Sequence, residues 1–214
     1  MKRAGGGGGR VPPHEVRIIG GEWKRSKLPV ADVPGLRPTP DRVRETLFNW
    51  LGQNLDGWRC LDAFAGSGAL GFEAASRGAS QVVLLERDRH LARSLGESAQ
   101  RLKATALRVE CADAAAWMAR AAPSSFDLVF LDPPFDSALA APALVAAARV
   151  IAPDGWIYLE QPRALGADAA LPADLRVVRQ GRAGAVHFHL LRRASADTPD
   201  GAPAPAPSAS SATG

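Results

Sequence analysis

Residues 60–71 read Cys-Leu-Asp-Ala-Phe-Ala-Gly-Ser-Gly-Ala-Leu-Gly, a short apolar run that leads directly into closely spaced glycines. This pattern is typical of a buried strand that turns sharply into a helix. Glycine lets a ligand approach the backbone closely, and the amides at a helix N-terminus attract anionic groups. The stretch therefore predicts a strand–turn–helix unit of an α/β fold, with a nucleotide-type cofactor bound at the turn.

Short apolar runs alternate with helical segments throughout the region that follows. The expected strands are residues 60–64, 82–86, 107–110, 128–132 and 156–160, and the expected helices start at Gly68 and cover 89–102, 113–122 and 137–152. Two further strand-like runs, 175–180 and 186–193, predict a closing hairpin. Because right-handed crossovers place helices on both sides of a parallel sheet, we expect an α/β fold with a seven-stranded, mostly parallel sheet, helices on both faces and an antiparallel C-terminal hairpin.

The chain of 214 residues has room for one α/β core with short appendages. We expect disordered tails at residues 1–14, which are basic and Gly-rich, and at 194–214, which are rich in Ala, Pro and Ser. Residues 15–57 are expected to form an N-terminal extension, and residues 58–193 the core. Within the extension, residues 39–51 predict an amphipathic helix whose apolar face carries Val43, Leu47, Phe48 and Leu51, and whose other face carries Arg42 and Arg44.

The positive charge is concentrated at the N-terminus. The whole chain carries a net charge of +4, and residues 1–31 contain seven Lys or Arg against Glu15 and Glu22, which gives +5 locally. Such a basic segment on a nearly neutral body is typical of proteins that bind polyanions, because Lys and Arg contacts to phosphate supply most sequence-independent affinity. A solvated basic terminus with no partner is the alternative, and charge alone does not separate the two.

Other classes of protein are disfavoured by what the sequence lacks. Its two cysteines, Cys60 and Cys111, lie far apart and form no CxxC motif, so neither a disulfide framework nor a zinc site is expected. The apolar stretch 138–152 is interrupted by Pro142 and Arg149, and glycines occupy the place of a signal-peptide core. We expect a cytoplasmic protein with no membrane partner and no metal.

Two acidic residues follow strands on the same expected sheet edge. Glu86 closes the second strand about twenty residues after Gly66, where a carboxylate can accept hydrogen bonds from both ribose hydroxyls. Asp113 follows the third strand, where it can bind an adenine amine or cap the next helix. Dehydrogenases share the ribose-binding acid, and residues 66–71 also match their GxGxxG motif, so an NAD-dependent enzyme stays an alternative.

The motif Asp132-Pro133-Pro134-Phe135 ends the fourth strand and points to specific chemistry. Its two prolines give a rigid backbone whose carbonyls are available as acceptors. An exocyclic base amine is a poor nucleophile, because its lone pair is delocalised into the ring, and a carboxylate with a fixed carbonyl can hold both N–H groups and redirect that lone pair. Phe135 can stack on an unstacked base. An ordinary Pro-rich turn is the alternative reading.

These segments resemble the Rossmann-like class I methyltransferases, and most closely the bacterial 16S ribosomal RNA (guanine-N2) methyltransferase family. The resemblance runs from about residue 17 to 193 and includes Arg-Ile-Ile-Gly-Gly at 17–21, Leu-Arg-Pro-Thr at 36–39 and the helix at 41–51, besides 62–71 and 132–135. The first two segments are more specific to the family than the glycine turn. One departure lies at Lys24-Arg25-Ser26-Lys27, where a glycine is expected between the basic residues.

The resemblance implies S-adenosylmethionine as cofactor and 16S ribosomal RNA, free or in an assembling small subunit, as partner. It assigns the target guanine to Asp132, Pro133, Pro134 and Phe135. Cofactor contacts fall on Asp62, Phe64, Gly66, Gly68, Glu86, Arg87, Asp113 and Thr39. RNA contacts fall on Arg17, Lys24, Arg25, Lys27, Arg37 and Arg42.

Three alternatives remain open from the sequence. A DNA adenine amine methyltransferase would use the same motif, although the chain lacks a recognisable target-recognition domain. An NAD-dependent dehydrogenase would explain the glycine turn and Glu86 but not residues 132–135. A non-enzymatic RNA-binding module would explain the basic N-terminus but not the polar residues at one sheet edge.

Overall fold

A computed structural model describes residues 15–31, 33, 38–135, 138–165 and 171–193, so the predicted tails at 1–14 and 194–214 lie outside the described residues. The elements in chain order are β1 (Glu15–Arg17), β2 (Lys27–Pro29), α1 (Asp41–Trp50), β3 (Arg59–Asp62), α2 (Ala69–Ser76), β4 (Gln81–Glu86), α3 (Arg89–Arg101), β5 (Leu107–Cys111), α4 (Ala114–Arg120), β6 (Phe126–Leu131), α5 (Ala140–Val150), β7 (Ile151–Gln161), β8 (Leu175–Ala183) and β9 (Val186–Arg193).

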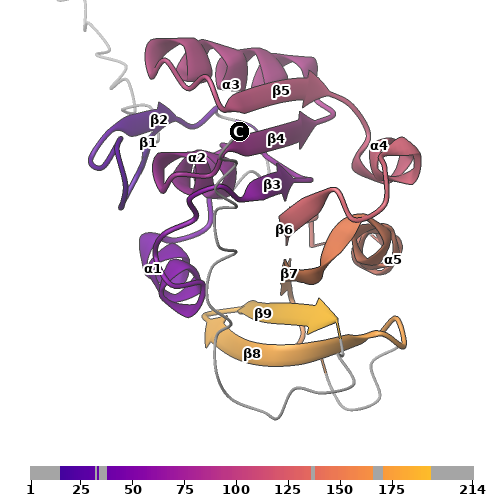
Figure 1. Cartoon of the computed structure of the whole chain (residues 1–214). Coiled ribbons are helices and arrows are strands. Elements are labelled where there is room, and N and C mark those ends of the chain that lie inside the picture. Colours follow the sequence, from indigo (N-terminus) through magenta and orange to yellow (C-terminus); the bar gives the residue numbers. More distant parts are fainter. Residues whose placement is uncertain (1–14, 32, 34–37, 136–137, 166–170, 194–214) are drawn as a thin grey trace, which may run out of the picture.

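The main sheet has seven strands in the order β5-β4-β3-β6-β7-β9-β8. The five strands from β5 to β7 are parallel, β9 is antiparallel to β7, and β8 is antiparallel to β9. The α1, α2 and α3 helices pack on one face, and α4 and α5 pack on the other (Figure 1). The predicted fold class, including the C-terminal hairpin, is confirmed.

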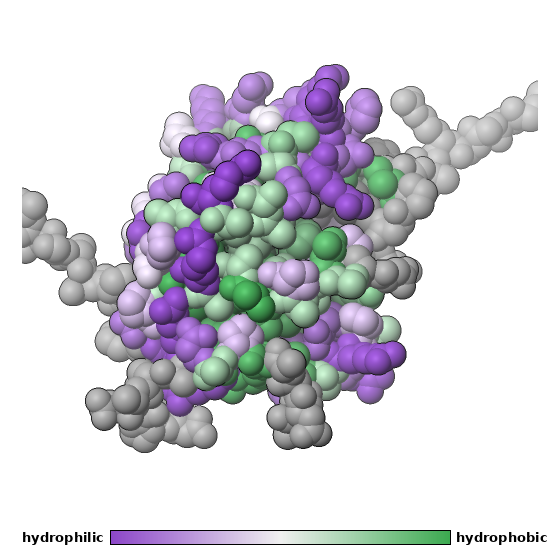
Figure 2. All heavy atoms as spheres, turned by 90° about the vertical axis from the view of Figure 1, so that its right-hand side faces the viewer, coloured by the Kyte–Doolittle hydropathy of each residue, from purple (hydrophilic) through white to green (hydrophobic). Residues whose placement is uncertain are grey.

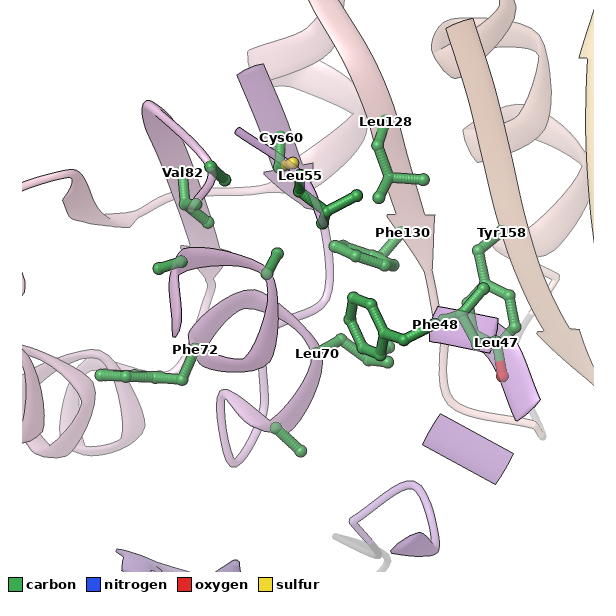
Figure 3. Packing of buried hydrophobic residues seen from close by; sticks show 14 of the residues in the cluster. Leu47, Phe48, Leu55, Cys60, Leu70, Phe72, Val82, Leu128, Phe130 and Tyr158 are labelled. Atoms are coloured by element: carbon green, nitrogen blue, oxygen red, sulfur yellow. The ribbon is translucent and has the colours of Figure 1, made fainter. Parts of the chain in front are cut away.

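A hydrophobic cluster on the α1 side joins the N-terminal segment to the sheet. It includes Leu47 and Phe48 of α1, Phe72 of α2, Phe130 of β6 and Tyr158 of β7, which are all fully buried. Figure 3 shows Phe48 beside Phe130, between the helix and the sheet, and the centres of the two rings are 6.3 Å apart. Residues 15–57 therefore share one core with the sheet, because burying this apolar face of α1 requires the sheet beneath it.

The strand β1 and the strand β2 form a small antiparallel sheet of their own, with Val16 opposite Leu28. Both of these side chains are buried, as is Ile18. Gly21 in the connecting turn has φ +72, and a Cβ there would lie 1.7 Å from the carbonyl oxygen of Ser76. The basic segment after residue 14 is thus a folded hairpin docked against α2, because only glycine allows this close approach.

Most element boundaries differ from the predicted ones by one to five residues, and two of these differences have a clear physical cause. The helix expected over 137–152 ends at Val150, because Ile151 pairs with Phe126 as the first residue of β7, and Pro153 follows as a residue that cannot donate to a continuing helix. The strand expected at 175–180 continues to Ala183. Gly181 stays within it because the ring of Phe188 fills the space over its Cα, where a Cβ would come within 2.3 Å of that ring.

The placement of Arg44 on the outer face of the α1 helix was wrong. Its side chain is fully buried, whereas that of Arg42 is exposed. Arg44 donates to Glu73 at 3.1 Å, and Glu73 is also fully buried. A helical pattern of charged and apolar residues assigns any arginine to solvent, and a buried carboxylate on another helix overrides that assignment.

Candidate active site

Acidic residues from four neighbouring strands meet at one edge of the sheet. Asp62 ends β3, Glu86 ends β4, Asp132 directly follows β6 and Glu160 lies near the end of β7. These strands are parallel and adjacent in the order β4-β3-β6-β7, so their carboxyl ends lie together. Ligands of open α/β sheets bind at this edge, which is therefore the candidate site.

The glycine turn between β3 and α2 shapes the first half of the site. Gly68 precedes α2 with φ +79, and a Cβ there would lie 2.6 to 2.9 Å from the side chains of Leu95 and Phe72. Gly66 donates its amide to Glu86 at 3.0 Å. This hydrogen bond joins the turn that the sequence predicts to the end of β4. Phe64, at the start of the turn, is half-buried.

Glu86 and Asp113 both occupy the predicted edge and both bind backbone amides. Besides Gly66, Glu86 accepts from the amide of Asp88 at 2.8 Å. A carboxylate has about four acceptor positions, so the two remaining positions suit the two hydroxyls of a ribose. Asp113 is exposed and caps α4 through the amide of Ala116 at 2.9 Å, while Arg87 is exposed beside Glu86.

Asp62 is a buried carboxylate whose hydrogen-bonding capacity is only partly used. Its side chain is 1% exposed; one oxygen accepts from the amide of Gly71 at 3.0 Å, and the other oxygen, Oδ1, has no hydrogen-bond partner. Burial raises the pKa of Asp62 to about 7, the amides of Gly71 and Phe64 oppose this rise, and the nearby Glu86 and Glu160 carboxylates add to it. A buried acceptor of this kind fits a positively charged group, such as the ammonium or sulfonium of S-adenosylmethionine.

Asp132 and its neighbours form the second half of the site. Thr39, which precedes α1, donates its hydroxyl to Asp132 at 3.4 Å. Burial raises the pKa of Asp132 well above its usual range, and the charges of Glu160 and Asp62 raise it further. Pro133 is buried, whereas Pro134 and Phe135 are exposed, Phe135 to 40%. An exposed aromatic ring can stack on a flat base.

An open pocket lies next to this motif. Its lining comes from the end of β6, the start of α5 and the end of β7, and comprises Pro133, Pro134, Phe135, Ala140, Glu160, Gln161, Pro162 and Arg163. It lies on the β7 side of the Asp132 motif, whereas the glycine turn lies on the other side, since β6 lies between β3 and β7.

Sequence reasoning missed Glu160. Its side chain is 3% exposed, and it accepts a hydrogen bond from the hydroxyl of Tyr158 at 2.8 Å. Burial raises the pKa of Glu160, and the hydroxyls of Tyr158 and Thr39 oppose that rise. A signal was present, because an acid closes the apolar run 156–160 just as Glu86 closes 82–86.

A second missed feature is a buried polar network that holds Thr39 in place. Arg44 donates to the carbonyls of Thr39 at 3.2 Å and Arg17 at 2.8 Å, besides its ion pairs with Glu73 and Asp41. Glu73 also accepts from Ile19 and from Arg77, whose guanidinium lies 4.5 Å from the centre of the Phe48 ring. No sequence pattern joins residues this far apart, and only the packing of α1 against α2 brings them together.

The residues predicted to bind RNA lie on the N-terminal hairpin and α1. Arg17, Lys24, Arg25, Lys27 and Arg42 are all exposed, and Arg37 lies outside the described residues. Arg25 adopts the left-handed conformation, with φ +74, at the position where a glycine was expected, and the turn forms with its amide bound to Ile18 at 2.8 Å. Lys27 pairs with Glu15 at 2.6 Å. The hairpin thus presents a cluster of cations to solvent.

The side of the molecule opposite the hairpin differs in hydropathy. Figure 2 shows hydrophobic atoms gathered at the centre of that face and hydrophilic atoms at its top, and Figure 1 places α4 and α5 on that side. Val145 of α5 is 62% exposed there. Polyanion binding is therefore better matched by the hairpin side than by this one.

Within the described ranges, no helix has the length and apolar character needed to cross a bilayer. The same part of the chain contains no group of three or more His, Cys, Asp or Glu side chains arranged to hold a metal ion.

Comparison with known proteins identifies a family and several relatives of this chain. A family model described as Conserved hypothetical protein 95 matches residues 16–192. The ribosomal RNA small subunit methyltransferase D of Escherichia coli is 42% identical over 185 residues, which cover 84% of this chain and 90% of that protein. The protein of the same name from Haemophilus influenzae is 41% identical over 185 residues, covering 83% of this chain and 94% of the relative.

A solved structure of a similar protein supports the same family. An Escherichia coli protein described as a candidate methyltransferase superposes with a TM-score of 0.74 at 40% identity, and the match covers 84% of this chain and 98% of that one. Since the family model spans nearly the whole described region and the relatives are matched over most of their length, the chain belongs to the Conserved hypothetical protein 95 family of class I methyltransferases, as a relative of the ribosomal RNA small subunit methyltransferases D.

Proposed function

We propose that the chain transfers the methyl group of S-adenosylmethionine to the exocyclic N2 amine of a guanine in small-subunit ribosomal RNA. The observation that carries this proposal is the position of Asp132-Pro133-Pro134-Phe135 at the end of β6, directly beside the Asp62 edge of the glycine turn. The names of the relatives from Escherichia coli and Haemophilus influenzae support ribosomal RNA of the small subunit as the substrate.

The half of the site over β3 and β4 would hold the cofactor, which when bound supplies an electrophilic methyl group on a sulfonium. Glu86 would accept from the ribose hydroxyls, and the unpaired Oδ1 of Asp62 would face the cationic methionine part. Asp113 has one oxygen engaged as the α4 cap, so its other oxygen would accept from the adenine amine. These contacts fix the position of the cofactor, and positioning supplies a large part of the acceleration in a direct transfer.

The half of the site over β6 and β7 would hold the base. Asp132 and the carbonyl of Pro133 would accept from the two N–H groups of the amine, which turns its lone pair toward the methyl group. The pKa of Asp132 is raised, so its carboxylate is a stronger proton acceptor than an exposed aspartate and can take the proton that the amine loses on methylation. Phe135 would stack on the base, which has to be unpaired to enter the pocket.

The proposal that the N2 amine of guanine is methylated rests on the family resemblance and on the amine-binding motif together. A DNA adenine methyltransferase would use the same carboxylate and aromatic ring. The exposed hairpin cations offer phosphate contacts but no element suited to read a duplex major groove. The family membership likewise favours methyl transfer over an NAD-dependent reaction.

The test is to incubate the chain with labelled S-adenosylmethionine and, in separate reactions, unmodified small-subunit particles, free small-subunit RNA and duplex DNA. Digestion and mass spectrometry then identify the methylated base. N2-methylguanine in ribosomal RNA supports the proposal. Methyladenine in DNA, or binding of NAD without S-adenosylmethionine, would overturn it.

A further inference from the structure

We propose that Glu160 accepts the N1–H of the target base and thereby makes the pocket select guanine over bases whose N1 carries no hydrogen. This inference rests on the proposed function, because it concerns the base in the same pocket. It assigns a specificity-determining contact to a residue outside the Asp132-Pro133-Pro134-Phe135 motif.

The register of the sheet places Glu160 beside the motif. Leu131 of β6 pairs with Leu159 of β7, so Asp132 and Glu160 are the next residues on two adjacent parallel strands. Burial raises the pKa of Asp132, and the charge of Glu160 raises it further, which is consistent with two carboxylates close together. Glu160 also lines the pocket together with Pro133 and Phe135. A base stacked on Phe135 with its amine at Asp132, and with its Watson–Crick edge turned toward β7, would present N1 to Glu160.

The orientation of Glu160 is fixed from behind by Tyr158, two residues earlier on the same strand. The Tyr158 hydroxyl donates to Oε1 of Glu160 at 2.8 Å. The ring of Tyr158 is buried, with its centre 6.3 Å from that of Phe130 and 6.4 Å from that of Phe188. A carboxylate has about four acceptor positions, and the hydroxyls of Tyr158 and Thr39 occupy two at most. The side chain keeps acceptor capacity on the pocket side and little freedom to turn away.

The chemistry of the base edge explains why a second carboxylate is useful. Guanine presents two neighbouring kinds of donor, the N2 amine and N1–H, whereas adenine presents an amine next to an N1 lone pair. A carboxylate facing N1–H gains a charge-assisted hydrogen bond, and one facing the adenine lone pair meets electrostatic repulsion while its own buried charge goes unpaired. Sites that hydrogen-bond one substrate in this way reject analogues that lack the donor.

An RNA with a modified target base distinguishes a role of Glu160 in base selection from a purely structural role. The base 2,6-diaminopurine keeps the 2-amine of guanine but has an unprotonated N1 and a second amine in place of O6. The guanine mapped in the experiment above is replaced by 2,6-diaminopurine in small-subunit RNA, free or assembled as that experiment requires. Single-turnover methylation of both RNAs is then compared for the unchanged chain, Glu160→Gln, Tyr158→Phe and, as a matched control, Glu45→Gln, which changes an exposed carboxylate of α1.

The unchanged chain is expected to prefer guanine, and Glu160→Gln to reduce that preference by about 10- to 100-fold, because glutamine can donate to the N1 lone pair of diaminopurine. Tyr158→Phe is expected to reduce the preference less, and Glu45→Gln to leave it unchanged. Calorimetry should show that Glu160→Gln still binds S-adenosylmethionine within a few-fold, which reports a folded site.

An equal loss of rate on both RNAs in Glu160→Gln, or no loss on either, would overturn the inference and leave the proposed function standing. Absence of guanine methylation by the unchanged chain would instead reject the proposed function itself.

Discussion

At Asp62, a buried carboxylate that would bind the cofactor also lowers the stability of the fold. Its carboxylate is buried with Oδ1 unpaired, and the pKa rises from an ordinary value of 3.8 to about 7. The folded chain therefore keeps a proton between about pH 4 and pH 7 that the unfolded chain releases. Stability falls as pH rises through this window, and the full loss is present above pH 7.

Asp62→Asn should remove this loss. An amide keeps an acceptor for Gly71 and carries no buried charge, so the melting temperature at pH 8 should rise and its decline from pH 4 to pH 7 should flatten. Binding of S-adenosylmethionine should weaken, because a cationic group would lose its partner. Thermal unfolding at several pH values and calorimetry check both effects. A variant that loses stability at pH 8 and binds the cofactor normally would contradict this account of Asp62.

Single residues were predictable where a motif names them. Asp62, Glu86 and Asp132 stand at strand ends in recognisable patterns, and the structure brings all three to one edge. Glu160 also closes an apolar run, 156–160, but no motif names it, and Arg44 stands in no such pattern. Their roles depend on which strand or helix becomes the neighbour, and that is a property of the packed chain rather than of local sequence.

At the scale of elements, the alternation of apolar and helical segments predicted the order and type of the core elements but not their ends. The end of α5 depends on pairing of Ile151 with Phe126, and the length of β8 depends on the Phe188 ring over Gly181. Both are contacts between neighbouring strands, which the periodicity of a single segment cannot show. The N-terminal hairpin was likewise read as a basic arm, because its strands of three residues are too short to give a pattern.

The Arg44 network joins this hairpin, α1 and α2, and its removal should loosen all three. Arg44→Met should lower the free energy of unfolding by about 3–5 kcal/mol, because breaking a buried ion pair removes one partner from Glu73 and one from each of two carbonyls. Glu73 keeps its ion pair with Arg77 in this variant, so we expect the loss of unfolding free energy to lie near the lower end of that range. Denaturant unfolding gives the value.

The exposed Arg42 on the same helix supplies the control. Arg42→Ala should change stability by no more than about 0.5 kcal/mol. Equal, small effects of the two substitutions would show that the buried network contributes little.

At the scale of the whole molecule, the charge distribution predicts how the chain approaches RNA. Lys24 and Arg25 are exposed at the tip of the hairpin. Replacing Lys24 by Ala and Arg25 by Gly removes both charges and keeps a residue suited to the left-handed turn. If each contacts a phosphate, the slope of log K against log salt for RNA binding should fall by about 0.7–0.9 per contact.

Cofactor binding should not change in this double variant, because the hairpin contributes none of the residues assigned to the cofactor. Filter binding or fluorescence titration at several salt concentrations measures the slope. An unaltered slope would mean that the hairpin cations are solvated and do not contact RNA.

The central claim is that the Asp132 carboxylate orients a base amine for methyl transfer. The most direct measurement is single-turnover methylation of unmodified small-subunit particles by the unchanged chain and by Asp132→Ala at saturating S-adenosylmethionine. We predict a rate lower by orders of magnitude in the variant, with cofactor affinity within a few-fold, because this contact matters mainly in the transition state. An Asp132→Ala chain that methylates the particles at the unchanged rate would contradict the account.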